Sequence, residues 1–457
     1  MGTSLFQNLI FQKFAHVRPI GVTAQLILRR LLDPTKLDEL FHEHAQAQSE
    51  RTLLFSALTH LVSAVVTGKC SSMNAGFAEF REQLGVSKTA MYEKLQRVEP
   101  QTTQALVRHA YRQVVEVRRR LGSAPRHAVP GYFVRILDGN HLSGTEHRLK
   151  ETRRVTAAPL PGKSLVVYDP RYEAVVDVFP MEDGHAQERS ELDAVIDTIL
   201  PRQLWIADRN FCTLKWLYEI DARGSACHVR HHQQLHGTER GKLRKVGTTQ
   251  TGTVWENQLE LPSYGGRTLT VRRIVVRLLE PTRDGDTEIV LLTNLPSEVA
   301  DAVRVAELYR DRWKIEKAFN HITLAYHCEI KPLCYPRAAL FCFANALVAY
   351  NAVSIMNALI GSEHGPEAVS SLSHFYMASE ITSVADGLLV ALPEHHWSPI
   401  ATMPIDELVG EMRRIVQGID LKRYRKSVRG PKKPTPKKIH NRRHVHVSVA
   451  KILAERH

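Results

Sequence analysis

The sequence predicts a multidomain α+β protein in which helical regions flank a central region of mixed strands and helices. Apolar residues recur at intervals of three and four over residues 1–128 and again over residues 336–420, which is the period of amphipathic helices. From Gly131 onward the pattern changes to short apolar runs that are typical of strands. Because 457 residues suffice for roughly two to four domains, we expect a composite fold.

Within the N-terminal region, residues 74–98 fit a helix-turn-helix pattern. A short helix over 74–83 is followed by a turn at Gly85, and Ser87 is a suitable N-terminal cap for a second helix. That helix would turn apolar residues inward and present polar residues suited to DNA phosphates and base edges. The inward residues are Met91, Leu95 and Val98, and the outward ones are Lys88, Tyr92, Lys94 and Arg97. A helical packing unit without DNA contacts is an equal alternative.

In the central region, two predicted strands each end on an aspartate. The apolar run 132–137 ends on Asp138, and the run 203–207 ends on Asp208. Further strands are expected over 165–168, 174–179 and 289–292, and helices over 188–200, 214–223 and 299–326, the last of which contains Glu316. Residues 233–287 are polar and glycine-rich with β-like runs at 253–261 and 268–279, which indicates an inserted sheet.

One segment in the C-terminal helical region is long enough to cross a bilayer, because residues 338–360 contain no charged side chain. Three amides within it, at Asn345, Asn351 and Asn357, would each need a partner in hydrocarbon. We therefore expect a buried core helix and no membrane association, with a membrane span as the alternative.

The composition is that of a globular protein, with 43% apolar and 24% charged residues and a net charge of +13. Between Lys422 and Arg443 there are eleven basic residues and no acidic one. A block of like charge usually forms a solvated arm, and basic arms commonly bind nucleic acid. We expect residues 421–457 to form such a basic arm, which contacts DNA through Lys432, Lys433, Lys437 and Lys438.

The positions of the cysteines and histidines indicate where in the cell the protein resides and whether it binds zinc. The six cysteines include no Cys-x-x-Cys pair, which favours neither a zinc ribbon nor a secreted disulfide framework. The first residues lack the layout of a signal peptide, so we expect a cytoplasmic protein. Adjacent histidines such as His231 and His232 follow no common zinc spacing and are expected at the surface or on phosphates.

Carboxylates that converge from rigid elements suit divalent metal ions. Two such ions about 3.5–4 Å apart can activate a nucleophilic oxygen and stabilise a leaving oxygen in phosphodiester chemistry. Mg²⁺ prefers carboxylate oxygens and retains several waters, so three protein carboxylates suffice. Asp138, Asp208 and Glu316 fit this requirement, whereas Asp169 and Asp177 lie on less suitable elements. An aspartate that ends a strand is, however, more often a turn or capping residue.

Residues 309–316, with the sequence Tyr-Arg-Asp-Arg-Trp-Lys-Ile-Glu, resemble the Tyr-x-x-Arg-x-x-x-Glu signature of bacterial Asp-Asp-Glu (DDE) transposases of the insertion sequence four family. Asp208 follows Asp138 by 70 residues, and Glu316 follows Asp208 by 108 residues with a β-rich insertion between them, which is similar to that family. The resemblance spans about residues 131–330. It implies a ribonuclease-H-like catalytic core, which is a mixed sheet flanked by helices.

By this resemblance Asp138, Asp208 and Glu316 would form a catalytic triad that holds two Mg²⁺ ions, for which Mn²⁺ may substitute. Tyr309 and Arg312 would contact the DNA end near the scissile phosphate. The spacing of Tyr309, Arg312 and Glu316 places them on one face of a helix. An ordinary Arg–Glu helix pair is the alternative.

Other residues near these motifs match the family less completely. Arg209 and Trp313 correspond to residues that are common beside the motifs and would also bind DNA. The family often has a lysine seven residues after the glutamate, where this sequence has Thr323. The missing positive charge could come from Lys314, Lys317 or Lys331, although the first two also fit a solvated helix face.

Together these features predict a transposase that binds the inverted-repeat ends of its element as a homodimer on double-stranded DNA, cleaves there and transfers the 3′-hydroxyl strands to a target. The expected division is a helical DNA-binding region at 1–128, a catalytic domain at 129–335 with its insertion at 233–287, a helical region at 336–420 and the basic arm. A structure-specific nuclease on the same fold and a catalytically inactive DNA-binding regulator are the alternatives. The family resemblance implies a bacterial, nucleoid-associated protein.

Overall fold

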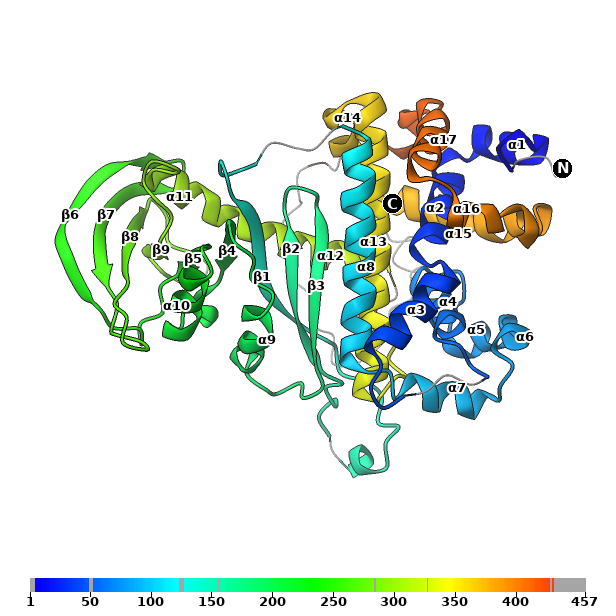
Figure 1. Ribbon diagram of the computed structural model, residues 1–457, viewed down its shortest axis with the longest axis horizontal. Helices are drawn as coiled ribbons and strands as arrows, with labels where there is room; N and C mark the ends of the chain where they lie inside the picture. Colours follow the sequence, from blue (N-terminus) through cyan, green and yellow to red (C-terminus); the bar gives the residue numbers. More distant parts are fainter. Residues whose placement is uncertain are drawn as a thin grey trace, which may run out of the picture.

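The computed structural model describes residues 5–48, 52–122, 127–154, 156–282, 285–326, 328–427 and 430. A sheet occupies one half of the molecule, and helices from both ends of the chain occupy the other half (Figure 1). Two long helices, α8 (Pro100–Arg120) and α13 (Pro336–His364), run side by side between these halves and pack on strand β3. The other helices of the terminal regions pack on α8 and α13 from the side away from the sheet.

The described part of the N-terminal region is helical, as predicted. It contains α1 (Leu9–Val17), α2 (Pro19–Leu31), α3 (Pro34–His44), α4 (Phe55–Val66), α5 (Met73–Glu79), α6 (Arg81–Leu84) and α7 (Lys88–Leu95) before α8. Local sequence explains several starts. The side chains of Asn8 and Asp33 accept backbone hydrogen bonds at the first turns of α1 and α3, and proline stands at the start of α2, α3 and α8.

The described strands form one nine-stranded sheet in the order β3-β2-β1-β4-β5-β9-β8-β7-β6. The strands are β1 (Phe133–His141), β2 (Lys163–Asp169), β3 (Ala174–Met181), β4 (Gln203–Ala207), β5 (Ala226–Arg230), β6 (Thr238–Thr249), β7 (Gly252–Glu260), β8 (Thr270–Leu278) and β9 (Glu288–Thr293). β2 pairs antiparallel with β1 and β3, whereas β1, β4 and β5 are parallel. This is the mixed sheet of a ribonuclease-H-like core, which confirms the predicted fold class.

The β-rich insertion is not the inserted sheet that we expected, because its strands extend the central sheet. β9 pairs antiparallel with β5, and β8, β7 and β6 follow outward from it. The sequence pattern did not indicate β5 or β6. β5 contains Cys227, His228 and Arg230 in place of an aliphatic run, and β6 is an edge strand whose side chains are mostly exposed and polar.

The two faces of the sheet pack against different helices. Leu137, Leu165 and Val167 belong to a core that includes α9 (Leu192–Ile196) and α10 (Leu214–Ala222). Their neighbours Ile136 and Val166 belong to the core that includes α8 and α13. This alternation is the two-residue period of strands. The helix expected over 188–200 is shorter, because residues Glu188–Glu191 form a 3-10 turn and α9 ends at Ile196.

α13 is the buried core helix predicted over 338–360. It is long and apolar enough to cross a membrane, with a mean hydropathy of 1.7, but 94% of its apolar window is buried inside the protein. The side chain of Asn351 accepts from Val175 N at 2.8 Å and donates to Val175 O at 2.9 Å. Asn345 accepts from Ser63 Oγ at 2.8 Å. These partners explain how α13 carries buried amides.

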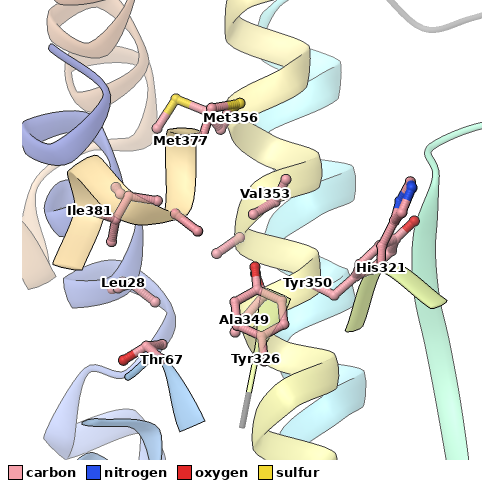
Figure 2. Close-up of a pocket in the computed structure, with 13 residues that line it drawn as sticks. Leu28, Thr67, His321, Tyr326, Ala349, Tyr350, Val353, Met356, Met377 and Ile381 are labelled. Carbon is pink, nitrogen blue, oxygen red and sulfur yellow. The ribbon is translucent and has the colours of Figure 1, made fainter. Parts of the chain in front are cut away.

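The remaining helices are α11 (Ala302–Tyr309), α12 (Trp313–Ala325), α14 (Pro366–Ser371), α15 (His374–Ala391), α16 (Ser398–Thr402) and α17 (Ile405–Gln417). An apolar pocket lies where α13 meets α2 and α15 (Figure 2). Leu28, Val353 and Ile381 line it, together with Tyr326 and the methionines Met356 and Met377. None of the predicted catalytic acids lies in this pocket.

Candidate active site

Parallel strands β1 and β4 bring Asp138 and Asp208 to the same edge of the sheet. Leu137 pairs with Ala207, so the two aspartates follow paired residues. Asp208 comes directly after β4, as predicted. Asp138 does not end its strand, because β1 continues to His141 and Asp138 pairs with Val166 of β2. β4 ends at Ala207, whereas β1 continues past Asp138. Asp138 is therefore paired with β2 on one side and lies beyond the end of β4 on the other side, where Asp208 follows.

Arg312 connects the first aspartate to the predicted glutamate. Its Nη1 donates to Asp138 Oδ2 at 3.1 Å, and its Nη2 lies 2.7 Å from Glu316 Oε1. The Arg312 side chain is 14% exposed, compared with 17% for Asp138 and 34% for Glu316. The structure therefore brings Asp138, Asp208 and Glu316 together, with a guanidinium between two of the carboxylates. The buried Nε of Arg312 has no hydrogen-bond partner in the described part of the chain.

The predicted single helix over 299–326 is interrupted within the Tyr-Arg-Glu segment. α11 ends at Tyr309, residues Arg310–Arg312 form a 3-10 turn, and α12 begins at Trp313. The expected single helix is therefore wrong, but the three residues still lie on one side, because Arg312 interacts with Tyr309 and with Glu316. Tyr309 is only 9% exposed, and its ring meets that of His228 edge-on, with centroids 5.6 Å apart. Burial raises the pKa of Tyr309 to about 12, and the nearby Arg312 charge opposes this rise.

Burial raises the pKa of both aspartates at the site, and neighbouring carboxylates raise it further. Burial raises the pKa of Asp138 to about 7, and the charges of Asp208 and Glu316 add to that effect while Arg312 opposes it. Burial also raises the pKa of Asp208, against hydrogen bonds from Asn210 and Phe211 N–H and the charge of Arg312, with a further increase from Glu188. Like charges that gather in a partly buried site favour a bound cation.

The donor set fits a divalent cation of the Mg²⁺ type, since it consists of carboxylate oxygens on a strand, a strand end and a packed helix. As the side chains stand, no three His, Cys, Asp or Glu residues among those described converge closely enough to hold one ion. Arg312 stands between Asp138 and Glu316 and accounts for part of that separation. The same oxygens would be available to a cation if this guanidinium moved.

The competing aspartates have structural partners instead. Asp169 is 2% exposed, and its Oδ2 accepts from Tyr111 Oη at 2.6 Å and from Arg135 Nη1 at 2.9 Å. Asp177 is 4% exposed and accepts from Arg108 at 2.8 Å and 2.9 Å. The carboxylates of Asp169 and Asp177 are therefore engaged in structural contacts between the sheet and neighbouring side chains. Of the three aspartates, Asp138 is the one that contacts Arg312 at the site.

Cations and an exposed tryptophan surround the acids. Trp313 is 57% exposed, and it lines an open polar pocket with Arg310, Lys314 and Lys317. Arg209, directly after Asp208, lines a second polar pocket with Arg230, His231 and His232. Thr323, where the signature would have a lysine, is exposed on α12. Lys314 lies 3.0 Å from Asp311, while Lys317 and Lys331 are exposed.

The predicted helix-turn-helix is present in part. The first helix is broken at Phe80 into α5 and α6, and Gly85 has a positive φ of 62° at the turn. Ser87 Oγ accepts from Ala90 N at 3.2 Å and caps α7. Met91, Leu95 and Val98 are buried. Lys88 and Arg97 are exposed, as predicted, and Tyr92 is half-buried. Lys94 lies over the Phe41 ring at 4.3 Å, so its expected outward position is wrong.

The DNA contacts predicted in the C-terminal basic arm, Lys432, Lys433, Lys437 and Lys438, lie outside the described residues.

The site contains a fourth acid, Glu188, which the sequence did not predict. It is the first residue of a 3-10 turn, its side chain is 14% exposed, and its Oε2 accepts from Asn210 Nδ2 at 2.8 Å. Its carboxylate also covers Gly139, since a Cβ on that glycine would come within 2.1 Å of Glu188 Oε1. A glycine inside a strand, directly after Asp138, was the available signal, because it marks a close approach.

The mixed sheet and its flanking helices define a ribonuclease-H-like α+β core, with the three predicted acids at its edge. Comparison with protein families supports a more specific assignment, because residues 130–352, slightly less than half of the chain, match the transposase DDE domain. The match contains all three predicted catalytic acids. This part of the chain is therefore similar to a transposase DDE domain.

Comparison with curated proteins finds no match. Seven chains of solved structures match. One of them is a cryo-EM structure of the piggyBac transposase synaptic complex with hairpin DNA, at 9% sequence identity and a TM-score of 0.40, covering 83% of this chain and 84% of that chain.

Proposed function

We propose that this protein is a metal-dependent DDE transposase that binds double-stranded DNA at the ends of its own element, cleaves phosphodiester bonds there and joins the freed 3′ ends to a target. The observation that carries this proposal is the meeting of Asp138, Asp208 and Glu316 around Arg312, at the edge of a DDE domain. Membership of the bacterial insertion sequence four family, and a cytoplasmic, nucleoid-associated location, are part of the same proposal.

Both steps exchange one phosphodiester bond for another bond at phosphorus. In cleavage, a water oxygen bonds to phosphorus, the bond to the 3′ oxygen breaks, and that oxygen takes up a proton. In transfer, the 3′ hydroxyl oxygen bonds to a target phosphorus and releases a target 3′ hydroxyl. Two bound Mg²⁺ ions, or Mn²⁺ in their place, would supply activation of the attacking oxygen and stabilisation of the leaving oxygen.

The residues of this chain would bind and orient the reacting groups. Asp138 and Asp208 are positioned by the sheet and Glu316 by the packed helix α12, so their carboxylates would hold the ions once Arg312 moves from between them. Arg312 would turn from the acids to the phosphate beside them, since guanidinium suits phosphate as well as carboxylate. Trp313 and Arg209 flank the same edge and would contact the DNA on either side.

DNA that reaches this edge would pass further basic surfaces. The loop between β1 and β2, residues 142–162, begins just after His141 and extends away from the sheet at its lower end (Figure 1). It is held at its base by Thr145 N, which donates to Pro159 O at 2.9 Å. Its tip exposes Lys150 and Arg154. Lys88 and Arg97 near α7 and the C-terminal basic arm would add contacts to phosphates.

A homodimer on DNA is the working form that we propose, because two element ends must meet and both strands of the target must be joined. The test is Mg²⁺-dependent cleavage of DNA that contains the boundaries of the coding element. Alanine at Asp138, Asp208 or Glu316 should each abolish cleavage, while Asp197→Ala, at an exposed aspartate near α9, should leave it intact. Full cleavage by any of the three variants would remove that acid from the catalytic set.

A strand-transfer assay with pre-cleaved ends separates the remaining alternatives. Cleavage without joining would indicate a structure-specific nuclease on the same fold. DNA binding with neither reaction would indicate a regulator that retains the acids without using them. The proposed transposase requires both reactions to depend on the same three carboxylates.

A further inference from the structure

We infer that Glu188 is a positioning residue of the active site, which fixes Asp208 through Asn210; this rests on the proposed function of the three acids. Asn210 connects the two acids directly. Its side-chain Nδ2 donates to Glu188 Oε2 at 2.8 Å, and its backbone N–H donates to Asp208 Oδ1 at 2.8 Å. A displacement of Glu188 would therefore release the Asn210 side chain. The backbone N–H of the same residue, which donates to Asp208, would then be less firmly held.

Glu188 also spans the gap between β1, which carries Asp138, and the end of β4, which is followed by Asp208. While its Oε2 binds Asn210 after β4, its Oε1 lies over Gly139 and 3.7 Å from His141 Nε2, both on β1. Gly139 follows Asp138 directly, and its own N–H donates to Asp138 Oδ1 at 3.0 Å. The carboxylate of Glu188 thus touches Gly139, which follows Asp138 directly, and Asn210, which is two residues after Asp208.

The electrostatic repulsion between Glu188 and the nearby acids indicates that Glu188 has a role beyond packing. Glu188 adds negative charge to a partly buried site that already holds three acids, and it raises the pKa of Asp208. Among the described residues its nearest cationic group is His141, which is charged only when protonated. A neutral amide at this position would keep the hydrogen bond from Asn210 and would remove only the charge. An acid at this position also strengthens the field that attracts divalent cations, and outer hydrogen-bond partners of metal ligands orient those ligands.

Mn²⁺ binding to the full-length protein, measured by electron paramagnetic resonance without DNA, tests the inference. Glu188→Ala should weaken Mn²⁺ binding by about 10–100-fold, the usual loss for an outer partner of a metal ligand. Glu188→Gln keeps an acceptor for Asn210 and should recover affinity to within about fivefold of wild type. Circular dichroism and thermal melting should show that both variants fold. A folded Glu188→Ala variant with wild-type affinity would overturn the inference, as would a Glu188→Gln variant that loses as much as alanine.

Gly139→Ala provides an independent route to the same displacement. Its new Cβ would meet Glu188 Oε1 and push that flexible side chain away, while Asp138 is unchanged. We expect a loss of Mn²⁺ affinity close to that of Glu188→Ala, and no further loss when the two changes are combined. Full additivity would contradict the inference. A wild-type protein whose Mn²⁺ binding does not depend on Asp138, Asp208 and Glu316 would instead contradict the proposed function and this inference with it, so the two failures are distinguishable.

Discussion

Arg312 donates to Asp138 Oδ2 at 3.1 Å and lies 2.7 Å from Glu316 Oε1, so one side chain supplies the positive charge between two acids of the candidate active site. These three side chains are between 14% and 34% exposed, which makes their mutual repulsion and attraction stronger than at the open surface. This guanidinium takes the electrostatic role that a bound cation would take. Metal binding and the position of Arg312 should therefore be coupled.

The first prediction concerns this coupling. Arg312→Ala should lower the free energy of unfolding of the metal-free protein by roughly 1–3 kcal/mol, because Asp138 and Glu316 lose a common partner. Saturating MgCl₂ should raise the melting temperature of the variant more than that of wild type, because cations replace the lost charge. Arg310→Ala, on the same 3-10 turn, is the matched control and should respond to Mg²⁺ as wild type does. An equal Mg²⁺ response in all three proteins would show that no such coupling exists.

The second prediction concerns the loop of residues 142–162. The double variant Lys150→Ala/Arg154→Ala should reduce the slope of log affinity against log salt by about 1.8 for a mixed-sequence DNA duplex, since each lost phosphate contact removes about 0.9. Lys13→Ala/Arg414→Ala removes two exposed cations from α1 and α17 and should leave the slope unchanged. Fluorescence anisotropy over a salt series measures both. A slope that both double variants share with wild type would exclude this loop from the DNA path.

The sequence predicted those parts of the site that depend on local pattern. β4 was placed correctly because a run of apolar residues ends sharply on Asp208, and α13 because its apolar run is too rich in amides for lipid. The break after Tyr309 was not predictable, because Arg310 and Arg312 are good helix formers and neither glycine nor proline interrupts the segment. Glu188 was missed because its role depends on the close approach of two strands across the sheet.

The third prediction concerns acid stability and rests on His228, which is 1% exposed beneath the Tyr309 ring. Burial lowers the pKa of His228 to about 3 from its ordinary value of 6.5. The unfolded chain therefore binds a proton below about pH 6.5 that the folded protein does not, so this residue should lower stability as pH falls from about 6.5 to 3. Stability at higher pH is unaffected by it.

The variant His228→Phe keeps a ring against Tyr309 and removes the titration. Urea unfolding between about pH 7 and pH 5 should show a decline in the free energy of unfolding that is flatter in the variant, by up to roughly 1.4 kcal/mol for each pH unit below 6.5. If wild type and variant decline in parallel, protonation of His228 does not contribute to acid unfolding.

The fourth prediction compares two buried amides on α13, the helix that packs between the terminal helices and the sheet. Asn351 pairs with both backbone groups of Val175 on β3, whereas the buried Oδ1 of Asn357 has no partner in the described part of the chain. Asn351→Leu should cost roughly 2–4 kcal/mol of unfolding free energy, because it leaves a buried N–H and a buried C=O unsatisfied.

Asn357→Leu is the matched control, since it replaces a 9% exposed amide with an apolar side chain of similar size in the same helix. It should be neutral or stabilising, because it removes an unsatisfied polar atom and adds buried apolar surface. Urea unfolding of the two variants measures the difference. If Asn357→Leu destabilises the protein as much as Asn351→Leu, the helix tolerates no change of shape at either position, and the hydrogen bonds to Val175 are not what fixes α13 to the sheet.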